Sequence, residues 1–289
     1  MMTQGTASAR ERTRFAPRRL PGWTLVLPGV LFLAVFFIVP LALMLANSLK
    51  DGVVTYAEVF TSPSHMKVFG NTLKTAVITT VVCLASAYPY AYVMQRVGAR
   101  LRLLLTALVL MPFWVSVLTR SFAWVGLLQD TGVINQTLMD WGVTDAPLPL
   151  IRTELGVLIG MVHVLLPFTV IPLMNAMGNI DGSYLRAAVS LGANPWQRFF
   201  KVFLPLSVPG VLAGGVLVFV MSLGFYITPA LLGSPDNMMV GELLIQEVQK
   251  IGTVRASAIG MILLGGTLVS LALVAAVQQI TTTTKEKRK

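Results

Sequence analysis

Carboxylates are scarce in this sequence, and none lies inside its long apolar segments. The 289 residues include 12 Asp and Glu against 22 Lys and Arg, and 55% of them are hydrophobic. A chain this apolar, with a mean hydropathy of +0.75, does not belong to the soluble globular class. A proton- or sodium-coupled carrier generally needs an ionisable or oxygen-rich site near the bilayer midplane, so the missing carboxylates argue against that class.

Cysteine and nucleotide-binding sequences are also lacking. Cys83 is the single cysteine and lies within an apolar segment, so we expect a small apolar residue there and no disulfide or thiolate metal site. The chain has no G-x-x-x-x-G-K-[ST] loop to hold nucleotide phosphates and no nucleic-acid-binding motif. We therefore predict no enzymatic activity, metal, cofactor or nucleic-acid partner. Any ATP that drives this protein must be hydrolysed by another subunit.

The sequence does contain six apolar segments long enough to cross a hydrocarbon core of roughly 30 Å as helices. All six are expected to be helical, because strand edges exposed to lipid leave backbone groups unpaired. The predicted fold is an all-α membrane protein over residues 23–280, between a basic segment at 1–22 and a basic tail at 281–289. The spans are placed at Trp23–Asn47, Thr72–Met94, Leu103–Leu127, Gly156–Met177, Leu206–Leu232 and Ser257–Ile280.

The distribution of basic residues predicts the orientation of these spans. Fifteen Lys and Arg lie in the two terminal segments and in the loops after the second and fourth spans, whereas the alternate loops hold five. Lys and Arg are retained on the cytoplasmic side, so both termini and the loop between spans four and five are predicted to be cytoplasmic. The first apolar segment is longer than that of a secretory signal and lacks a convincing cleavage site, so we expect it to remain as a span.

The loop at 181–210 has the pattern of two helices, each with its own capping residues. Asp181 or Ser183 is suited to cap the first helix, and Gly192 tolerates the left-handed conformation that ends it. Spacings of four and three residues predict one shared apolar face on this helix, formed by Tyr184, Ala188 and Leu191.

The second helix of this loop is predicted to begin at Asn194-Pro195, a cap followed by the favoured first helical residue. Its aromatic residues recur at i, i+3, i+4 and i+7, which predicts a single stripe of Trp196, Phe199, Phe200 and Phe203. A connection between spans has no need of two capped helices, so we expect this loop to dock against another protein.

At this loop the sequence resembles a known family. Residues 184–193 (YLRAAVSLGA) and 202–210 (VFLPLSVPG) are similar to the cytoplasmic EAA loop of bacterial ABC-importer permeases. The resemblance extends to 71–73 (NTL), 112–124 (PFWVSVLTRSFAW) and 225–233 (FYITPALLG), which look most like the spermidine/putrescine-type permeases. One departure is that Arg186 stands where the motif usually has Glu.

The resemblance implies that this loop contains a coupling helix, which sits in a cleft of a separate ATPase subunit. The residues that it assigns to ATPase coupling are Tyr184, Arg186, Ala187, Ala188, Gly192, Ala193, Pro195 and Phe199. Since Arg186 reverses the usual charge, we expect either a neutral or acidic residue opposite it or an Arg186 side chain that swings to solvent.

Candidates for the solute pathway come from the third and fifth spans. Trp114, Trp124, Phe225 and Tyr226 are suited to form aromatic walls for a cationic amine, but aromatic belts and packing are the alternative. Arg120 is expected to reach water at the outer end of its span, with a role in the pathway as the alternative.

Two further patterns predict packing. We expect His163 to be a hydrogen-bonded interior residue, and Gly210 and Gly214 to form a G-x-x-x-G helix crossing. In the outer loop 129–152, an interfacial helix is predicted from Ile134, Leu138 and Trp141.

The function predicted from the sequence is that of a multi-pass permease in the bacterial inner membrane, most consistent with polyamine import by alternating access. The partners implied are two ATPase copies, a second homologous permease, a periplasmic or extracellular solute-binding protein and membrane lipid. The alternatives are an ABC permease for another solute, such as ferric iron, sulfate or an opine-like amino acid, and an ion-coupled secondary carrier. For the outer loop, binding-protein contact and packing on the membrane surface are both left open.

Overall fold

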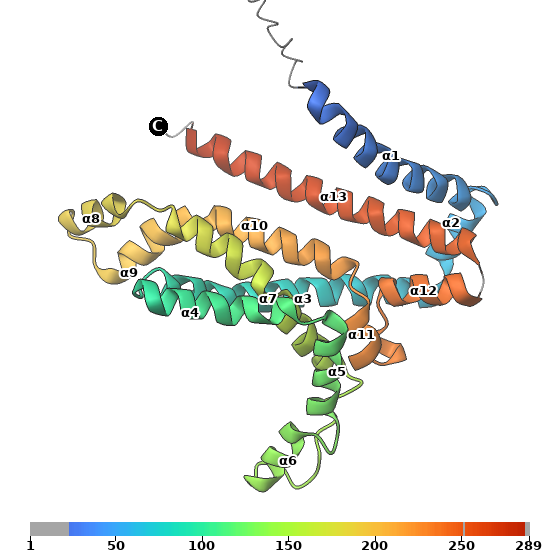
Figure 1. Cartoon of the computed structure of the whole chain (residues 1–289), viewed down its shortest axis with the longest axis horizontal. Helices are drawn as coiled ribbons and strands as arrows, with labels where there is room; N and C mark the ends of the chain where they lie inside the picture. The colour runs from blue at the N-terminus through green and yellow to red at the C-terminus, as the bar shows by residue number, and fades with distance from the viewer. Residues whose placement is uncertain (1–22, 251, 287–289) are drawn as a thin grey trace, which may run out of the picture. The chain divides into compact units, whose positions relative to one another are not determined.

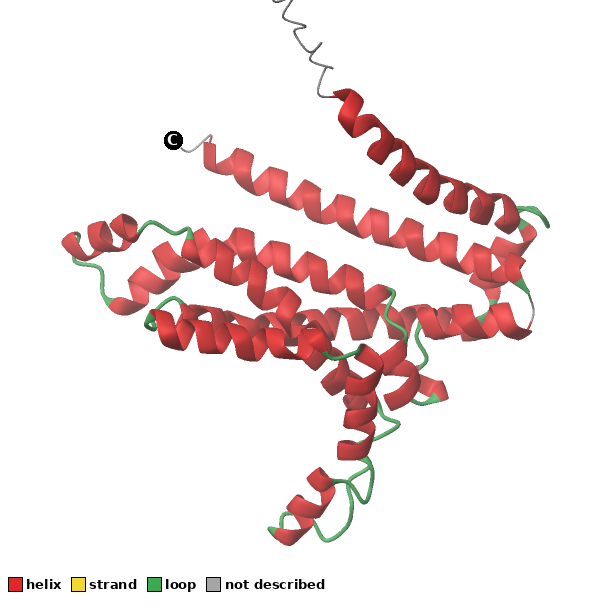
Figure 2. Ribbon diagram, viewed as in Figure 1, coloured by secondary structure: helices red, strands yellow, loops and turns green. Residues whose placement is uncertain are grey.

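The computed structural model describes residues 23–250 and 252–286, and this part of the chain is helical with no strand (Figures 1 and 2). It divides into two units, 1–44 and 45–289. Five helices are long and apolar enough to span a membrane, or six if one bent helix pair counts as a span. The predicted segment at 1–22 lies outside the described residues, and the last helix continues to Glu286, past the predicted end at 280.

The first unit contains most of α1 (Trp23–Ser48), which confirms the first predicted span. No side chain from Val26 to Met44 is buried, and the helix includes Pro28 and Pro40. An all-round apolar surface of this length is suited to lipid or to other membrane helices, because it has no polar face to present to water.

Three long helices form the centre of the second unit, and they correspond to the second, fourth and fifth predicted spans. They are α3 (Pro63–Met94), α7 (Glu154–Gly178) and α10 (Leu204–Leu223), and each packs against the other two, as Figure 1 shows. Buried apolar side chains such as Met161, Leu165 and Val218 fill the space between them. The sixth span is α13 (Thr253–Glu286), which packs mainly on α2 (Val54–Thr61) and α12 (Val240–Lys250).

The crossing of α7 and α10 depends on glycine. A Cβ atom at Gly210 would lie 2.5 Å from the Cβ of Ala176, and one at Gly214 would lie 3.1 Å from the carbonyl oxygen of Thr169. Small residues allow helix backbones to approach closely in a membrane, where van der Waals packing drives helix association. The predicted G-x-x-x-G crossing is therefore confirmed.

The third predicted span is not one continuous helix. It consists of α4 (Ala99–Leu110), the 3₁₀ turn η1 (Met111–Trp114) and α5 (Val117–Leu128), and the chain bends by 97° between η1 and α5. Pro112 has no backbone N–H, so the helical ladder loses a bond there, and Val115 and Ser116 are extended. Apolar length alone predicted a straight helix here, and the bend corrects that expectation.

The fifth predicted span also ends early. α10 stops at Leu223, and the chain turns through Gly224–Tyr226 before α11 (Ile227–Leu232). After the short turn η3 (Pro235–Asn237), residues 236–240 are tied back to α3. Asn71 donates its amide N–H to the carbonyl oxygen of Asp236 at 2.7 Å, and the Val240 N–H donates to the Thr72 hydroxyl at 2.9 Å. The 71–73 segment thus fixes the connection between α11 and α12.

The outer loop contains the predicted short helix, α6 (Val133–Asp140). Ile134 packs against the main buried cluster, while Trp141 at the end of the helix is exposed. Asn135 is fully buried and connects α6 to the later part of the loop. Its side-chain amide donates to the Leu148 carbonyl and accepts the Leu148 N–H. The loop is therefore a folded surface feature.

Candidate functional sites

The first site is the 181–210 loop, whose two capped helices are present. The Asp181 carboxylate caps α8 (Gly182–Ser190) by accepting the Ser183 N–H at 2.8 Å, and this hydrogen bond holds the pKa of Asp181 below its usual range. Gly192 follows at φ +80°, and the Ala193 N–H closes the helix on the Ala188 carbonyl at 2.9 Å. These contacts fix the turn between the two helices.

The second helix begins with a capping box. Asn194 accepts the Gln197 N–H at 2.8 Å, Gln197 accepts the Asn194 N–H at 3.1 Å, and Pro195 occupies the first turn of α9 (Pro195–Arg198). The predicted start of this helix is confirmed. It continues into α10 through a π-helix, η2 (Phe199–Phe203), which the sequence pattern did not predict.

The predicted aromatic stripe divides into an inner and an outer pair. Phe199 and Phe203 pack edge to face on the ring of Tyr92 in α3, with centroid distances of 5.4 and 5.0 Å. Trp196 and Phe200 stack on each other at 5.7 Å and are exposed. The π-helix has more residues per turn than an α-helix, so positions that share a face at 3.6 residues per turn no longer do so. The single stripe is corrected to two surfaces.

The first helix shows a similar division. Ala188 is buried, whereas Tyr184 is more than half exposed and Leu191 is 87% exposed, so the predicted common face is buried only at Ala188. Ala187, Gly192 and Pro195 are exposed and Ala193 is half-buried.

The loop thus presents several large apolar side chains to solvent, and such a patch marks a contact surface. Its members are Tyr184, Val189, Leu191, Trp196 and Phe200, which we call the apolar patch.

Arg186 is exposed and turns toward the start of its own helix. A Cβ atom at Gly182 would lie 3.1 Å from Arg186 Nη1, and the Arg186 charge also helps to lower the pKa of Asp181. None of the ion pairs in the described residues includes Arg186. Its guanidinium therefore lies in solvent beside the Asp181 carboxylate.

The second site is a cavity of about 520 Å³ beside the bend between η1 and α5, which we call the Arg120 cavity. It brings together three of the five predicted pathway residues, Trp114, Arg120 and Phe225. Trp114 is 91% exposed, whereas Arg120 is only 9% exposed. The bend places Trp114 and Arg120 on the wall of one cavity, and the remaining wall is supplied by Phe113, Val115, Ser116, Val117, Val164, Phe168 and Met221.

Arg120 was expected at the outer end of a straight span, but it lies on the wall of the Arg120 cavity. The 97° bend leaves its side chain against α7 and α10 rather than at the end of a straight span, and its Nε and Nη1 atoms are buried without hydrogen-bond partners among the described residues. No sequence pattern marked Phe168 or Met221, which line the cavity from α7 and α10. Phe113 was adjacent to a predicted residue.

The other two predicted pathway residues do not line this cavity. The Trp124 indole N–H donates to His163 Nδ1 at 3.0 Å, so both residues belong to the packing between α5 and α7, and His163 is the hydrogen-bonded interior residue that was predicted. Tyr226 lies at the break before α11, partly exposed. A hydrogen bond of 2.9 Å between the buried hydroxyls of Ser121 and Thr228 joins α5 to α11 next to the cavity.

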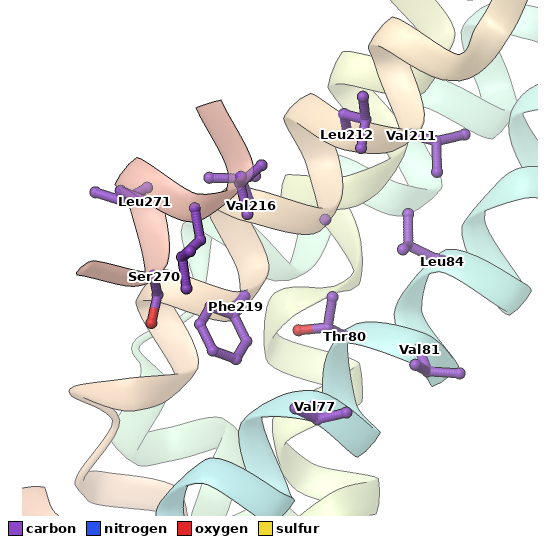
Figure 3. A pocket seen from close by; sticks show the side chains of 13 residues that line it. Val77, Thr80, Val81, Leu84, Val211, Leu212, Val216, Phe219, Ser270 and Leu271 are labelled. Atoms are coloured by element: carbon purple, nitrogen blue, oxygen red, sulfur yellow. The ribbon is translucent and has the colours of Figure 1, made fainter. Parts of the chain in front are cut away.

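A separate apolar groove of about 420 Å³ lies between α3, α10 and α13 (Figure 3). Its walls are aliphatic apart from Phe219 and the hydroxyls of Thr80 and Ser270, which themselves donate to backbone carbonyls one turn earlier in their helices. A surface without free polar groups offers lipid or helix contact and no chemistry for a polar solute.

Comparison with known proteins identifies the family. Residues 87–282 match the family model described as the binding-protein-dependent transport system inner membrane component. The chain is 37% identical over 226 residues to the spermidine/putrescine transport system permease protein PotB of Haemophilus influenzae, covering 75% of this chain and 79% of PotB. It is 26% identical to the probable sulfate transport system permease protein cysT of Nephroselmis olivacea, covering 91% and 90%.

Solved structures show the same fold. A chain of the bacterial alginate ABC transporter, crystallised in complex with an alginate pentasaccharide-bound periplasmic protein, superposes with a TM-score of 0.76 at 19% identity, covering 90% of this chain and 94% of that one. The family match includes the 181–210 loop and the Arg120 cavity. This chain therefore belongs to the family of binding-protein-dependent transport system inner membrane components.

Proposed function

We propose that this protein is a permease subunit of an ATP-driven importer for polyamines, with both termini and the 181–210 loop in the cytoplasm. The observation that carries the solute assignment is the 37% identity to PotB over most of both chains. The Arg120 cavity supports it, because the rings of Trp114, Phe168 and Phe225 offer faces that attract organic cations.

The proposed mechanism is alternating access driven by a pair of ATPase subunits. The apolar patch docks in the ATPase, and the residues Tyr184, Arg186, Ala187, Ala188, Gly192, Ala193, Pro195 and Phe199 form or support the contact. When the ATPase subunits close on nucleotide, the 181–210 loop moves with them. Phe199 and Phe203 then transmit that movement to Tyr92 in α3, and the central helices rock about the pathway.

The remaining partners follow from the same proposal. A second permease subunit completes the pathway, and a solute-binding protein delivers solute to the outer side, where the loop 129–152 offers Asp130, Asp140 and Asp145. A carboxylate-bearing outer surface is suited to hold a complementary basic surface of the binding protein.

Reconstitution tests this function. The complete importer is placed in proteoliposomes with its ATPase and binding protein, and ATP hydrolysis and uptake are measured with spermidine and putrescine. Polyamine-stimulated hydrolysis that is matched by uptake is the expected result. Uptake by the purified chain without an ATPase, or uptake that follows a proton gradient instead of ATP, would contradict the proposal.

A second candidate solute is an oxyanion such as sulfate. The match to the sulfate permease of Nephroselmis olivacea over 91% of the chain favours it, as does Arg120, a lone cation on the cavity wall. Stimulation by sulfate but not by spermidine in the same assay would select this candidate.

A further inference from the structure

Arg120 is a largely buried cation that forms no ion pair with a carboxylate of the described residues. Its side chain lines the Arg120 cavity, its Nε and Nη1 atoms have no hydrogen-bond partners among the described residues, and no described ion pair includes it. Burying a charge that is neither paired nor hydrogen-bonded is strongly unfavourable, so such groups normally pair with an opposite charge.

The carboxylates of this chain are engaged elsewhere or lie in other parts of the sequence. Glu154 pairs with Lys74 at 2.7 Å, Glu58 with Arg255 at 2.9 Å and Asp236 with Lys67 at 2.7 Å. None of the six predicted spans contains Asp or Glu. No carboxylate of the described residues pairs with Arg120, so a neutralising carboxylate is expected from another molecule.

The cavity is incomplete on the side from which such a carboxylate would approach. Trp114, on the same wall, is 91% exposed, and Phe113 is about half exposed. A tryptophan ring left bare beside a buried guanidinium is the kind of surface that a second protein covers, because aromatic residues and arginine dominate the energetics of protein contacts.

We propose that Arg120 forms an ion pair with an Asp or Glu in a membrane span of the second permease subunit, across the Arg120 cavity. This inference rests on the proposed polyamine function, since a polycationic solute would be repelled by an unpaired guanidinium. Paired in this way, Arg120 no longer repels the solute. This chain supplies aromatic surface to the pathway, and the partner carboxylate cancels the charge of Arg120.

The identity of the partner follows from the same observation. A second copy of this chain carries no Asp or Glu in its spans and would bring a second Arg120 to the interface. Like charges at an interface are unfavourable, and no neutralising group would be present. The proposed ion pair therefore requires a second permease whose sequence differs from this one.

The composition of the importer gives the first test. The complex is purified through a tag on this chain, and its membrane subunits are identified by mass spectrometry. The expected result is one copy of this chain and one of a different permease with at least one Asp or Glu inside a span. A complex with two copies of this chain, or a partner whose spans lack carboxylates, overturns the inference.

Charge exchange gives the second test. Arg120→Gln and Arg120→Glu are expected to lower polyamine uptake by at least about 30-fold, which is typical of removing one member of a buried charge pair. Replacing the correct partner carboxylate by Arg in the Arg120→Glu importer should restore uptake. Lys74→Gln is the matched control, because it removes a cation from an exposed pair and should leave uptake unchanged.

The outcomes separate this inference from the proposed function. If the unmodified importer shows no polyamine-stimulated hydrolysis, the proposed function fails before any variant is made. If it does, but Arg120→Gln assembles and transports normally, or no single exchange among the partner's span carboxylates restores Arg120→Glu, the ion pair is wrong. If the Arg120 variants lose uptake only of solutes that carry a carboxylate, Arg120 binds the solute itself. That result would also overturn the ion pair.

Discussion

Phe199 and Tyr92 meet edge to face, with their ring centroids 5.4 Å apart and their planes at 84°. The guanidinium of Arg96 lies over the same Tyr92 ring, 4.3 Å from its centroid. A residue of the π-helix and a residue near the end of α3 are thus held in one aromatic cluster. A displacement of Phe199 is therefore expected to be transmitted to α3 through these rings.

Phe199→Ala is expected to uncouple ATP hydrolysis from transport. The substitution removes the ring contacts with Tyr92 and Tyr88, and one with Phe200 of the apolar patch, at a cost in stability of about 1.5 to 3 kcal/mol. The measurement is the ratio of solute moved to ATP hydrolysed. Phe60→Ala removes an exposed ring from α2 and serves as the control. An unchanged ratio for Phe199→Ala would remove these rings from the coupling route.

Gly192→Val is expected to distort the turn between α8 and α9. Gly192 has φ +80°, a conformation that costs an L-residue about 1 to 2 kcal/mol and a β-branched residue more. The membrane spans do not depend on this turn, so the variant should insert normally but bind the ATPase weakly. Co-purification with the ATPase is the measurement. Gly98→Ala, in open space at negative φ, is the control and should bind normally. Normal ATPase binding by Gly192→Val would show that the turn is not needed for docking.

Most of the helices were predictable because apolar length and capping residues act locally. Asp181, Asn194 and Pro195 occupy the cap positions expected from their chemistry. The breaks at 115–116 and 224–226 were not predicted, because a hydropathy pattern does not register a bend within an apolar segment. Phe199 lies in a π-helix and packs on Tyr92 of α3, an arrangement that a spacing of 3.6 residues per turn does not predict.

The Arg120 cavity could be predicted only in part for the same reason. Trp114 and Arg120 lie in one sequence segment, and their chemistry marked both as candidates. Phe168 and Met221 complete the wall from α7 and α10, and only tertiary packing brings them there. Trp124 has the same chemistry as Trp114, but its indole N–H is used by His163.

Gly214→Val is expected to disrupt the crossing of α7 and α10. Even a Cβ at this position would lie 3.1 to 3.3 Å from three atoms of Thr169, so the larger side chain forces the helices apart. Overpacking of this kind typically costs about 1 to 3 kcal/mol. The thermal midpoint of the detergent-solubilised protein should fall. Gly265→Val adds the same side chain to an open position on α13 and should have little effect. Equal midpoints for both variants would contradict the close crossing.

Glu242→Gln is expected to stabilise the protein near neutral pH and to lose that advantage in acid. Burial raises the pKa of Glu242 above its ordinary value, and Gln246 offers only a single hydrogen bond of 3.3 Å. A carboxyl with a raised folded-state pKa favours the folded state when protonated, so the wild type loses stability as pH rises through that pKa. The neutral amide keeps an acceptor for Gln246 and never carries the charge. The thermal midpoint of the variant should therefore exceed that of the wild type at pH 8, and the two should converge as pH falls below the ordinary glutamate pKa.

Asp140→Asn, at an exposed position on α6, is the matched removal of a carboxylate and should show no such difference in thermal midpoint. A constant difference across the pH range would mean that the effect of the substitution is steric and that the Glu242 charge carries no cost.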